Sequence, residues 1–476
     1  MKPSRSSMWQ NECANNPQGH GELDTIYASL ETQCKARDWP LASIDFLLIC
    51  GDFQAVRNER DLACMSVPRR YRRLEDFHRY YSGEATAPVL TIVIGGNHEA
   101  SNYSFELYHG GWLAPNIYYL GAAGVVRYGP WRIGGISGIY LPGDYEKPHY
   151  ERLPYDRDMI KSVYHVRGYD VAKMKRLTRG GSASSGRGVI DVCMSHDWPQ
   201  WVELFGDYES LYRDKPHFLE SAKKDYLGSR PAKELLGQLR PSYWFSGHMH
   251  WKFSADIEHK EAVIDETIRG LPVPNDLKTK LPVFNRSKRT SAQPSDVCSP
   301  PATTHFHALS KVGPHIPYYL ELLELELPPQ GDAEESFPKE ESGSYTLCYD
   351  EEWLAITRAY NDSLRVADPE TLVVPPEPRT HGKHKAEPPT IEDHKAWVKE
   401  NIADKGLLRI PRNFIAHAPT QSSMTSQSGR RSEDQQPEEY LNEQTVKFCE
   451  LLQMTNKFTE SVGEVVDDGG VEFGWD

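Results

Sequence analysis

Residues 89–99 read VLTIVIGGNHE: a mostly apolar run, two glycines, and then an asparagine, a histidine and a glutamate. Short apolar runs bounded by glycine are typical of buried strands. Helix-like stretches such as residues 22–37 separate this run from others of its kind. The alternation predicts an α/β layered domain, in which side chains that follow strand ends carry the chemistry. Three further runs end in polar residues: 44–49 before Gly51-Asp52, 189–194 before Ser195-His196, and 243–245 before Gly247-His248-Met249-His250.

The side chains that follow these runs are of types that bind divalent metals. Taken singly, Asp52 could belong to an ordinary turn, and His196 could be a hydrogen-bonded core histidine. His248 and His250 are a stronger signal, because side chains two residues apart in an extended segment share a face. An amide beside an imidazole, as at Asn97, is unusual for packing alone. The motifs in series therefore favour one shared metal site over chance.

Phosphodiester hydrolysis gives a chemical reason for this set of residues. An anionic nucleophile must approach an anionic phosphate, and two metal ions both neutralise charge and lower the pKa of water. One carboxylate has to bridge the ions, and Asp52 is the natural candidate. Histidine and amide ligands leave the cations strongly Lewis acidic. His98, beside a ligand, is suited to act as a general acid or to hold the phosphate.

The order of these motifs resembles the metallophosphoesterase superfamily, and longer strings resemble the RNA lariat debranching enzymes within it. The likeness covers residues 19–255 closely and residues 304–416 more loosely. The strings that carry it are 20–27 (HGELDTIY), 50–58 (CGDFQAVRN), 80–83 (YYSG), 95–101 (GGNHEAS), 110–121 (GGWLAPNIYYLG), 134–140 (GGISGIY), 164–167 (YHVR) and 195–199 (SHDWP).

The resemblance implies a metallophosphoesterase-type layered β-sandwich flanked by helices, with a smaller C-terminal domain. It also implies hydrolysis of the 2′,5′-phosphodiester branch of excised intron lariat RNA by a metal-bound hydroxide, with His98 helping the 2′-oxygen to leave. Fe2+, Zn2+ and Mn2+ suit such ligands alike. By motif, one metal pocket would use His20, Asp52 and His250, and the other Asp52, Asn97, His196 and His248.

Residues 137–167 correspond to the lariat recognition loop of that family. The RNA-binding residues predicted there can stack on bases or hold phosphates: Tyr140, Lys147, Arg152, Tyr164, His165 and Arg167. Without the family likeness, an ordinary charged surface loop would explain them equally well. Residues 68–73 (PRRYRR) are a second candidate for RNA contact, because they place cations beside an aromatic side chain, although a solvated helix face is the simpler explanation.

The same likeness and the local composition divide the chain into five parts. We expect a catalytic domain over residues 19–260 and the family's C-terminal domain over residues 304–416. Residues 261–303 are rich in Pro, Ser, Thr, Lys and Arg, which is typical of a linker. Residues 417–476 are predicted to be a largely disordered acidic tail. Residues 1–18 form an atypical N-terminal segment.

The N-terminal segment departs from the family pattern. Debranching enzymes have Cys-x-His after the first strand, whereas this chain reads Gln18-Gly19-His20, and a neutral amide is a weaker ligand than a thiolate. Residues 8–18 are too polar for a buried strand, so we expect the first strand to be missing. Three origins fit: a misassigned start or splice junction, which we favour; an isoform with a weakened metal pocket; or a binding protein without catalysis.

Composition limits the other possibilities. No apolar run is long enough to cross a bilayer, no signal peptide is visible, and the eight cysteines form no C-x-x-C pair, so we expect an intracellular protein without membrane association. The net charge of −14 lies in the second half: residues 1–260 hold 32 Lys and Arg against 31 Asp and Glu. The substrate class implies a nuclear location, with branched intron RNA as the partner. A metallophosphatase of another substrate and a non-catalytic RNA-binding or spliceosome-associated protein remain the alternatives.

Overall fold

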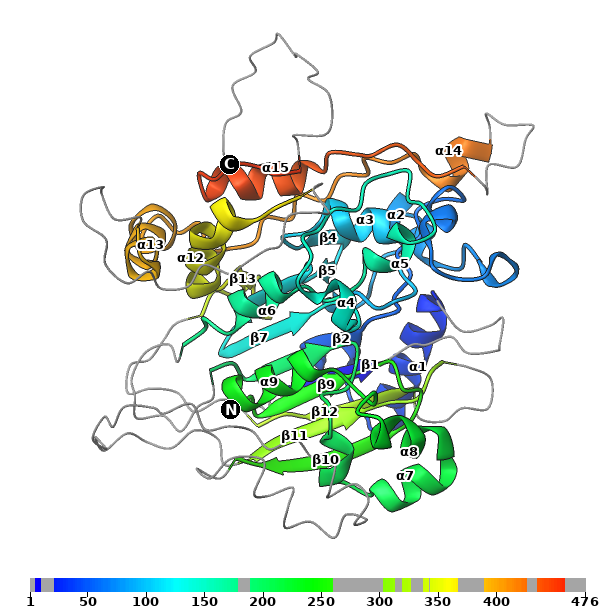
Figure 1. Ribbon diagram of the computed structural model, residues 1–476. Coiled ribbons are helices and arrows are strands. Elements are labelled where there is room, and N and C mark those ends of the chain that lie inside the picture. Colours follow the sequence, from blue (N-terminus) through cyan, green and yellow to red (C-terminus); the bar gives the residue numbers. More distant parts are fainter. Residues whose placement is uncertain are drawn as a thin grey trace, which may run out of the picture.

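The computed structural model describes residues 5–9, 21–178, 189–259, 303–312, 319–326, 337–341, 343–366, 389–425 and 435–458, and for residues 5–9 the backbone alone. Two stacked sheets form the centre of the molecule (Figure 1). The six-stranded sheet runs β12 (Leu320–Glu324), β1 (Arg5–Trp9), β2 (Phe46–Cys50), β3 (Thr91–Ile94), β5 (Ile117–Tyr119), β4 (Gly111–Ala114). The seven-stranded sheet runs β10 (Phe253–Glu258), β11 (Thr303–Ala308), β9 (Tyr243–Ser246), β8 (Val192–Ser195), β7 (Trp131–Ile136), β6 (Ala123–Tyr128), β13 (Leu347–Tyr349).

Helices cover the outer faces of the sheets and one end of the molecule (Figure 1). The α-helices are α1 (Leu23–Ala36), α2 (Phe77–Ser82), α3 (Ser101–Glu106), α4 (Pro142–Tyr145), α5 (Met159–Ser162), α6 (Gly168–Met174), α7 (Tyr208–Asp214), α8 (Pro216–Lys223), α9 (Arg230–Leu239), α12 (Glu351–Tyr360), α13 (Ile391–Val398), α14 (Gln421–Thr425) and α15 (Glu443–Leu451). The shorter helical turns are η1 (Leu41–Ser43), η2 (Asp61–Cys64), η3 (Arg69–Tyr71), η4 (Val202–Phe205), η5 (Asn361–Ser363) and η6 (Lys399–Ala403).

Alternation along the central strands explains the layering. In β2, Phe46 and Leu48 point into the core between the sheets, where they meet residues such as Met194 of β8. Leu47 and Ile49 point to the other face and pack with α1. Because both faces of the strand are buried, its sequence is apolar throughout rather than alternating. The predicted helix-flanked β-sandwich is confirmed. The helix-like stretch at residues 22–37 corresponds to α1, whose buried face includes Leu23, Ile26, Tyr27 and Leu30.

The prediction that the first strand is missing was wrong. Strand β1 (Arg5–Trp9) pairs parallel with β2 and antiparallel with β12, so the six-stranded sheet is continuous at this position. The strand begins upstream of residues 8–18, the segment that we judged too polar. Ladder hydrogen bonds join backbone groups, so a polar sequence can form a strand when both edges are supplied with partners. Residues 10–20 lie outside the described part of the chain.

The C-terminal part of the chain is built into both sheets and is not a separate layer. Strand β12 extends the first sheet, while β11 and β13 belong to the second. The prediction of a largely disordered tail is wrong for residues 435–458, which include α15. Gln444 of α15 exchanges two hydrogen bonds with the backbone of Trp112 in β4, at 2.8 and 2.9 Å. The side-chain amide thereby supplies hydrogen-bond partners to backbone groups at the edge of the sheet. The predicted linker, residues 261–303, lies outside the described residues apart from Thr303. No described helix is long and apolar enough to cross a membrane.

Candidate active site

The four predicted motifs lie at the carboxyl ends of four neighbouring strands. Asp52 follows β2 and Asn97 follows β3, and these strands pair in parallel in one sheet. His196 follows β8 and His248 follows β9, and these strands pair in parallel in the other sheet. Stacking of the sheets brings the two pairs of strand ends together. A ligand site at this edge is the expected place in a layered α/β protein.

Three of the motifs meet at the imidazole of His196. Its Nε2 lies 3.0 Å from Asn97 Oδ1 and 3.5 Å from Asp52 Oδ1. Its Nδ1 lies 2.7 Å from the carbonyl oxygen of Cys50. A carbonyl can only accept, so Nδ1 carries the proton, and the Nε2 lone pair is directed at the shared space. The ring of His248 lies 5.1 Å from that of His196.

The glycines of the motifs permit this close approach. A Cβ on Gly96 would lie 2.2 Å from Asp52 Oδ1, and a Cβ on Gly51 would lie 2.3 Å from His196 Nδ1. The backbone φ angle is 50° at Asp52 and 67° at His248, in the left-handed region that residues other than glycine seldom occupy. Such strained residues gather at functional sites, where the surrounding structure holds them in place.

Burial sets the electrostatics of the site. It raises the pKa of Asp52 to about 6, although the charge of His98 and hydrogen bonds from the backbone of His98 and Asn97 oppose the rise. It lowers the pKa of His196 to about 4 and that of His248 well below its usual value. The imidazoles are therefore neutral at pH 7, which is the form that binds cations.

Glu99 is a positioning residue to which the sequence analysis gave no role. Its carboxylate accepts hydrogen bonds from the backbone N–H groups of Phe53 and Gln54, both at 2.7 Å, and of Gly96 at 3.2 Å. It thereby ties the loop after β2 to the loop after β3. Its place at the end of the GGNHE string was the only signal in the sequence.

The donor set fits divalent cations. Asp52 is fully buried, and within the described residues its Oδ2 has no hydrogen-bond partner. A buried carboxylate oxygen of this kind needs a partner, and a cation can supply one. No group of three or more His, Cys, Asp and Glu side chains in the described residues is arranged to hold a metal ion. The converging set includes an amide, Asn97, and His20 lies outside those residues.

His250, two residues after His248, is half-buried. Burial and the charge of Lys311 lower its pKa to about 3, which puts Lys311 in its surroundings. Its φ of 52° matches the strained backbone of His248. His98 does belong to the cluster: its backbone N–H donates to Asp52 Oδ1 at 2.8 Å, and its side chain is half-buried.

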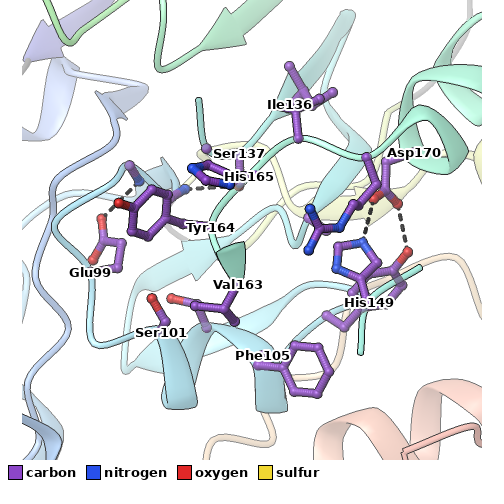
Figure 2. A pocket seen from close by; sticks show the side chains of 18 of the residues that line it. Glu99, Ser101, Phe105, Ile136, Ser137, His149, Val163, Tyr164, His165 and Asp170 are labelled. Carbon is purple, nitrogen blue, oxygen red and sulfur yellow. Dashed lines mark hydrogen bonds and ion pairs between the residues drawn. The ribbon is translucent and has the colours of Figure 1, made fainter. Parts of the chain in front are cut away.

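A cavity of about 50 Å³ lies beside the loop that follows β3 (Figure 2). Gly96 and Glu99 line one wall, and Tyr164 and His165 of the predicted recognition loop line another. The hydroxyl of Tyr164 lies 3.2 Å from Ser66 Oγ, and the charge of Asp52 helps to raise the pKa of this tyrosine. The recognition loop is therefore close to the candidate active site.

The predicted RNA-binding residues fall into two groups. Tyr140, Lys147 and Tyr164 are partly exposed, and Lys147 bonds to Asp144 at 2.6 Å. His165 is buried against the other oxygen of Asp144, also at 2.6 Å. These contacts fix the shape of the loop.

The predicted RNA contact of Arg167 stays a prediction, and in this conformation its side chain is buried. Its side chain is 0% exposed and bonds to Glu151, which is equally buried, and to two backbone carbonyls. Arg152 is mostly covered as well, with Phe105 beneath it and Glu439 3.6 Å away. Arg167 and Arg152 pair with the carboxylates of Glu151 and Glu439. The spacing of basic residues in the sequence did not reveal these partners.

Fold and site together define a metallophosphoesterase. In agreement, residues 19–252 match the family model described as calcineurin-like phosphoesterase, and residues 301–457 match that of the lariat debranching enzyme C-terminal domain. The lariat debranching enzyme of Arabidopsis thaliana is 38% identical over 91% of this chain and 84% of its own length. That of Schizosaccharomyces pombe is 35% identical over 93% and 96%, and that of Homo sapiens 39% over 91% and 67%. The chain belongs to the lariat debranching enzyme family.

Proposed function

We propose that this protein hydrolyses the 2′,5′-phosphodiester branch of excised intron lariat RNA. The observation that carries the proposal is the meeting of Asp52, Asn97 and His196 at the ends of strands from both sheets. Among the described residues, one carboxylate oxygen of Asp52 has no hydrogen-bond partner. The relatives named above are lariat debranching enzymes, which supports the choice of substrate. Branched RNA is accordingly the proposed partner.

The residues of the chain divide the work of the reaction. Asp52, Asn97, His196 and His248 would hold divalent cations, which neutralise phosphate charge and lower the pKa of water when bound. We include His20 and His250 in the ligand set on the family likeness alone. The metals proposed are Fe2+, Zn2+ or Mn2+, because imidazole, carboxylate and amide ligands suit all three.

His98 is the proposed acid toward the departing 2′-oxygen. It is half-buried, so a substrate can reach it, and its backbone is fixed by the bond to Asp52. An imidazole in that place can donate a proton to the leaving oxygen or hold a phosphate oxygen. Tyr164 of the recognition loop is the proposed contact to the branch, and its position near Asp52 supports this role.

A substrate comparison tests the proposal. The full chain, with each of the three metals added in turn, is given a branched RNA, a linear 3′,5′-linked RNA of the same sequence, and an aryl phosphate. We expect rapid loss of the 2′,5′ bond only. Faster cleavage of the aryl phosphate would instead identify a phosphatase of another substrate. Retention of branched RNA without cleavage, whatever the metal, would identify the non-catalytic alternative, which the family membership does not favour.

The cellular site of the reaction is also part of the proposal. Introns are excised in the nucleus, so an enzyme that acts on their branches is expected there. Imaging of the full-length protein in cells would test this, and exclusion from the nucleus would contradict it.

A further inference from the structure

Residues 68–73, here called the arginine ridge, carry four arginines and no acid in a chain whose net charge is −14. Arg69, Arg70 and Arg73 are exposed, and Tyr71 and Arg72 are half-buried. The ridge belongs to the loop between β2 and α2, which projects at the right of Figure 1. Its charge contrasts with the rest of the protein. We propose that the arginine ridge binds the phosphates of the RNA strand that leaves the active site, an inference that rests on the proposed function.

The ridge is held in a defined shape. Its first half is the 3₁₀ turn η3, closed by hydrogen bonds from Tyr71 N to Pro68 O at 2.8 Å and from Arg72 N to Arg69 O at 3.2 Å. Arg72 Nε donates to Val67 O at 2.8 Å. The guanidinium of Arg70 lies over the ring of Tyr71 at 4.7 Å. Exposed cations on a fixed backbone lose less entropy on binding a phosphate chain than cations on a flexible one.

Packing connects the ridge to the loops of the candidate active site. Tyr71 and Leu74 pack on an apolar cluster beneath the loop, which joins the segment after Asp52 to Ala100, the first residue beyond the GGNHE string. The cluster consists of Val56, Leu62, Met65, Val67 and Ala100. The position of the ridge is thus tied to the two loops that carry Asp52 and Asn97.

Residues just outside the two ends of the ridge contact parts of the site. On one side, Ser66 Oγ lies 3.2 Å from the hydroxyl of Tyr164, which belongs to the recognition loop. On the other side, Asp76 N donates to Gly21 O at 3.2 Å, next to the predicted ligand His20. An RNA strand that leaves a branch held between Tyr164 and Gly21 would pass the arginines of the ridge.

Acidic residues that follow the arginine ridge in the sequence limit the path of the RNA strand. Glu22, Glu75 and Asp76 lie near one another, and burial together with repulsion from Glu22 and Asp76 raises the pKa of Glu75. Phosphates would be repelled there. Arg73 faces this cluster, since its charge opposes the rise. The strongest phosphate contacts are therefore expected at Arg69 and Arg70.

The test compares two triple variants of the full chain. The ridge variant is Arg69→Gln, Arg70→Gln and Arg73→Gln, which keeps Arg72 and its bond to Val67. The matched control is Arg213→Gln, Lys224→Gln and Lys399→Gln, three exposed cations of α7, the end of α8 and η6. Both variants lose the same charge. Each is assayed on a minimal branched RNA and on one whose arms extend by about 15 nucleotides, roughly the length that one binding surface covers.

We expect the ridge variant to raise KM for the long-armed RNA about tenfold, while kcat and the KM for minimal RNA stay unchanged. The slope of log affinity against log salt should fall by about 2, because each lost contact to a single strand removes about 0.7. The control variant should match the wild type. Equal KM and equal slope in the two variants would overturn the proposal and favour an acidic protein as the partner of the ridge.

A failure of the proposed function would look different. If the wild type cleaves no branched RNA, the ridge is tested by equilibrium binding of a linear RNA as long as one extended arm. The same loss of affinity and salt slope is then expected in the ridge variant alone, and equal binding by both variants would refute the ridge independently of catalysis.

Discussion

Buried charges are treated differently in two regions of this protein. At the candidate active site, Asp52 is fully buried and one of its oxygens has no hydrogen-bond partner among the described residues. In the C-terminal clamp, which we define as Arg132, Asp350 and Glu352, the buried Asp350 has both oxygens bonded to Arg132, at 2.7 and 2.8 Å. Arg132 also bonds to Glu352 at 2.8 Å. The clamp is complete within the chain, whereas the site is not.

The pKa values show the consequence. Burial alone would raise the pKa of Asp350, but the charges of Arg132 and Arg127 and the hydrogen bonds of Arg132 lower it to about 2. At Asp52 burial prevails, and the pKa rises to about 6. The clamp fastens the C-terminal part of the chain to β7. At the site, one oxygen of Asp52 has no hydrogen-bond partner among the described residues and can bind a cation. One region contributes stability and the other contributes function.

The largest expected effect comes from removing the stored charge. Asp52→Asn should lower kcat/KM for branched RNA by on the order of 10³-fold, because cation binding supplies several kcal/mol of transition-state stabilisation. In a chelator, its unfolding free energy should be equal to or higher than that of the wild type, since the unpaired buried charge is gone. Steady-state assays and urea titrations measure the two quantities. A variant that keeps a tenth of the activity would show that Asp52 is not a metal ligand.

Breaking the clamp should have the opposite signature. Asp350→Asn should lower the unfolding free energy by about 3 kcal/mol, because it leaves the buried Arg132 without its main counter-charge. Activity per folded molecule should be unchanged. Glu392→Gln is the matched control: Glu392 is exposed and pairs with Lys395 at 2.9 Å, so its loss should stay within about 0.5 kcal/mol. Equal midpoints in urea for the two variants would contradict the assigned role of the clamp.

Lowering the pH should also affect the stability contributed by the clamp and by the site in different ways. The folded pKa of Asp350 lies below its unfolded value, so its contribution to stability is fully present above about pH 4 and is lost as the pH falls toward 2. The wild type should lose about 2 kcal/mol more than Asp350→Asn between neutral pH and pH 2. Asp52 and Glu99 have raised pKa values and act with the opposite sign at higher pH. If the unfolding free energies of the wild type and Asp350→Asn changed equally with pH, Asp350 would not be the group responsible.

The site was more predictable from the sequence than the clamp. Motifs such as Gly95 to Glu99 combine a strand and its metal-type side chains in a few adjacent residues, so local pattern places them. The clamp joins residues more than 200 positions apart, and no local pattern reports such a pairing. The burial of Arg167 against Glu151 was missed for the same reason, since it depends on how a loop folds over itself. Strand β1 was missed because its partners β2 and β12 support it through the backbone.

The smallest effect concerns the departure from the family pattern at Gln18. If the site is short of ligand strength there, Gln18→Cys should raise debranching activity about tenfold at limiting metal, because a thiolate binds these cations more tightly than an amide does. The gain should vanish at saturating metal. Gln33→Cys, on α1, controls for an added thiol and should change nothing. Equal activity of wild type and Gln18→Cys at every metal concentration would mean that the charge stored at Asp52 is met without a ligand at position 18, and that the first motif is dispensable in this chain.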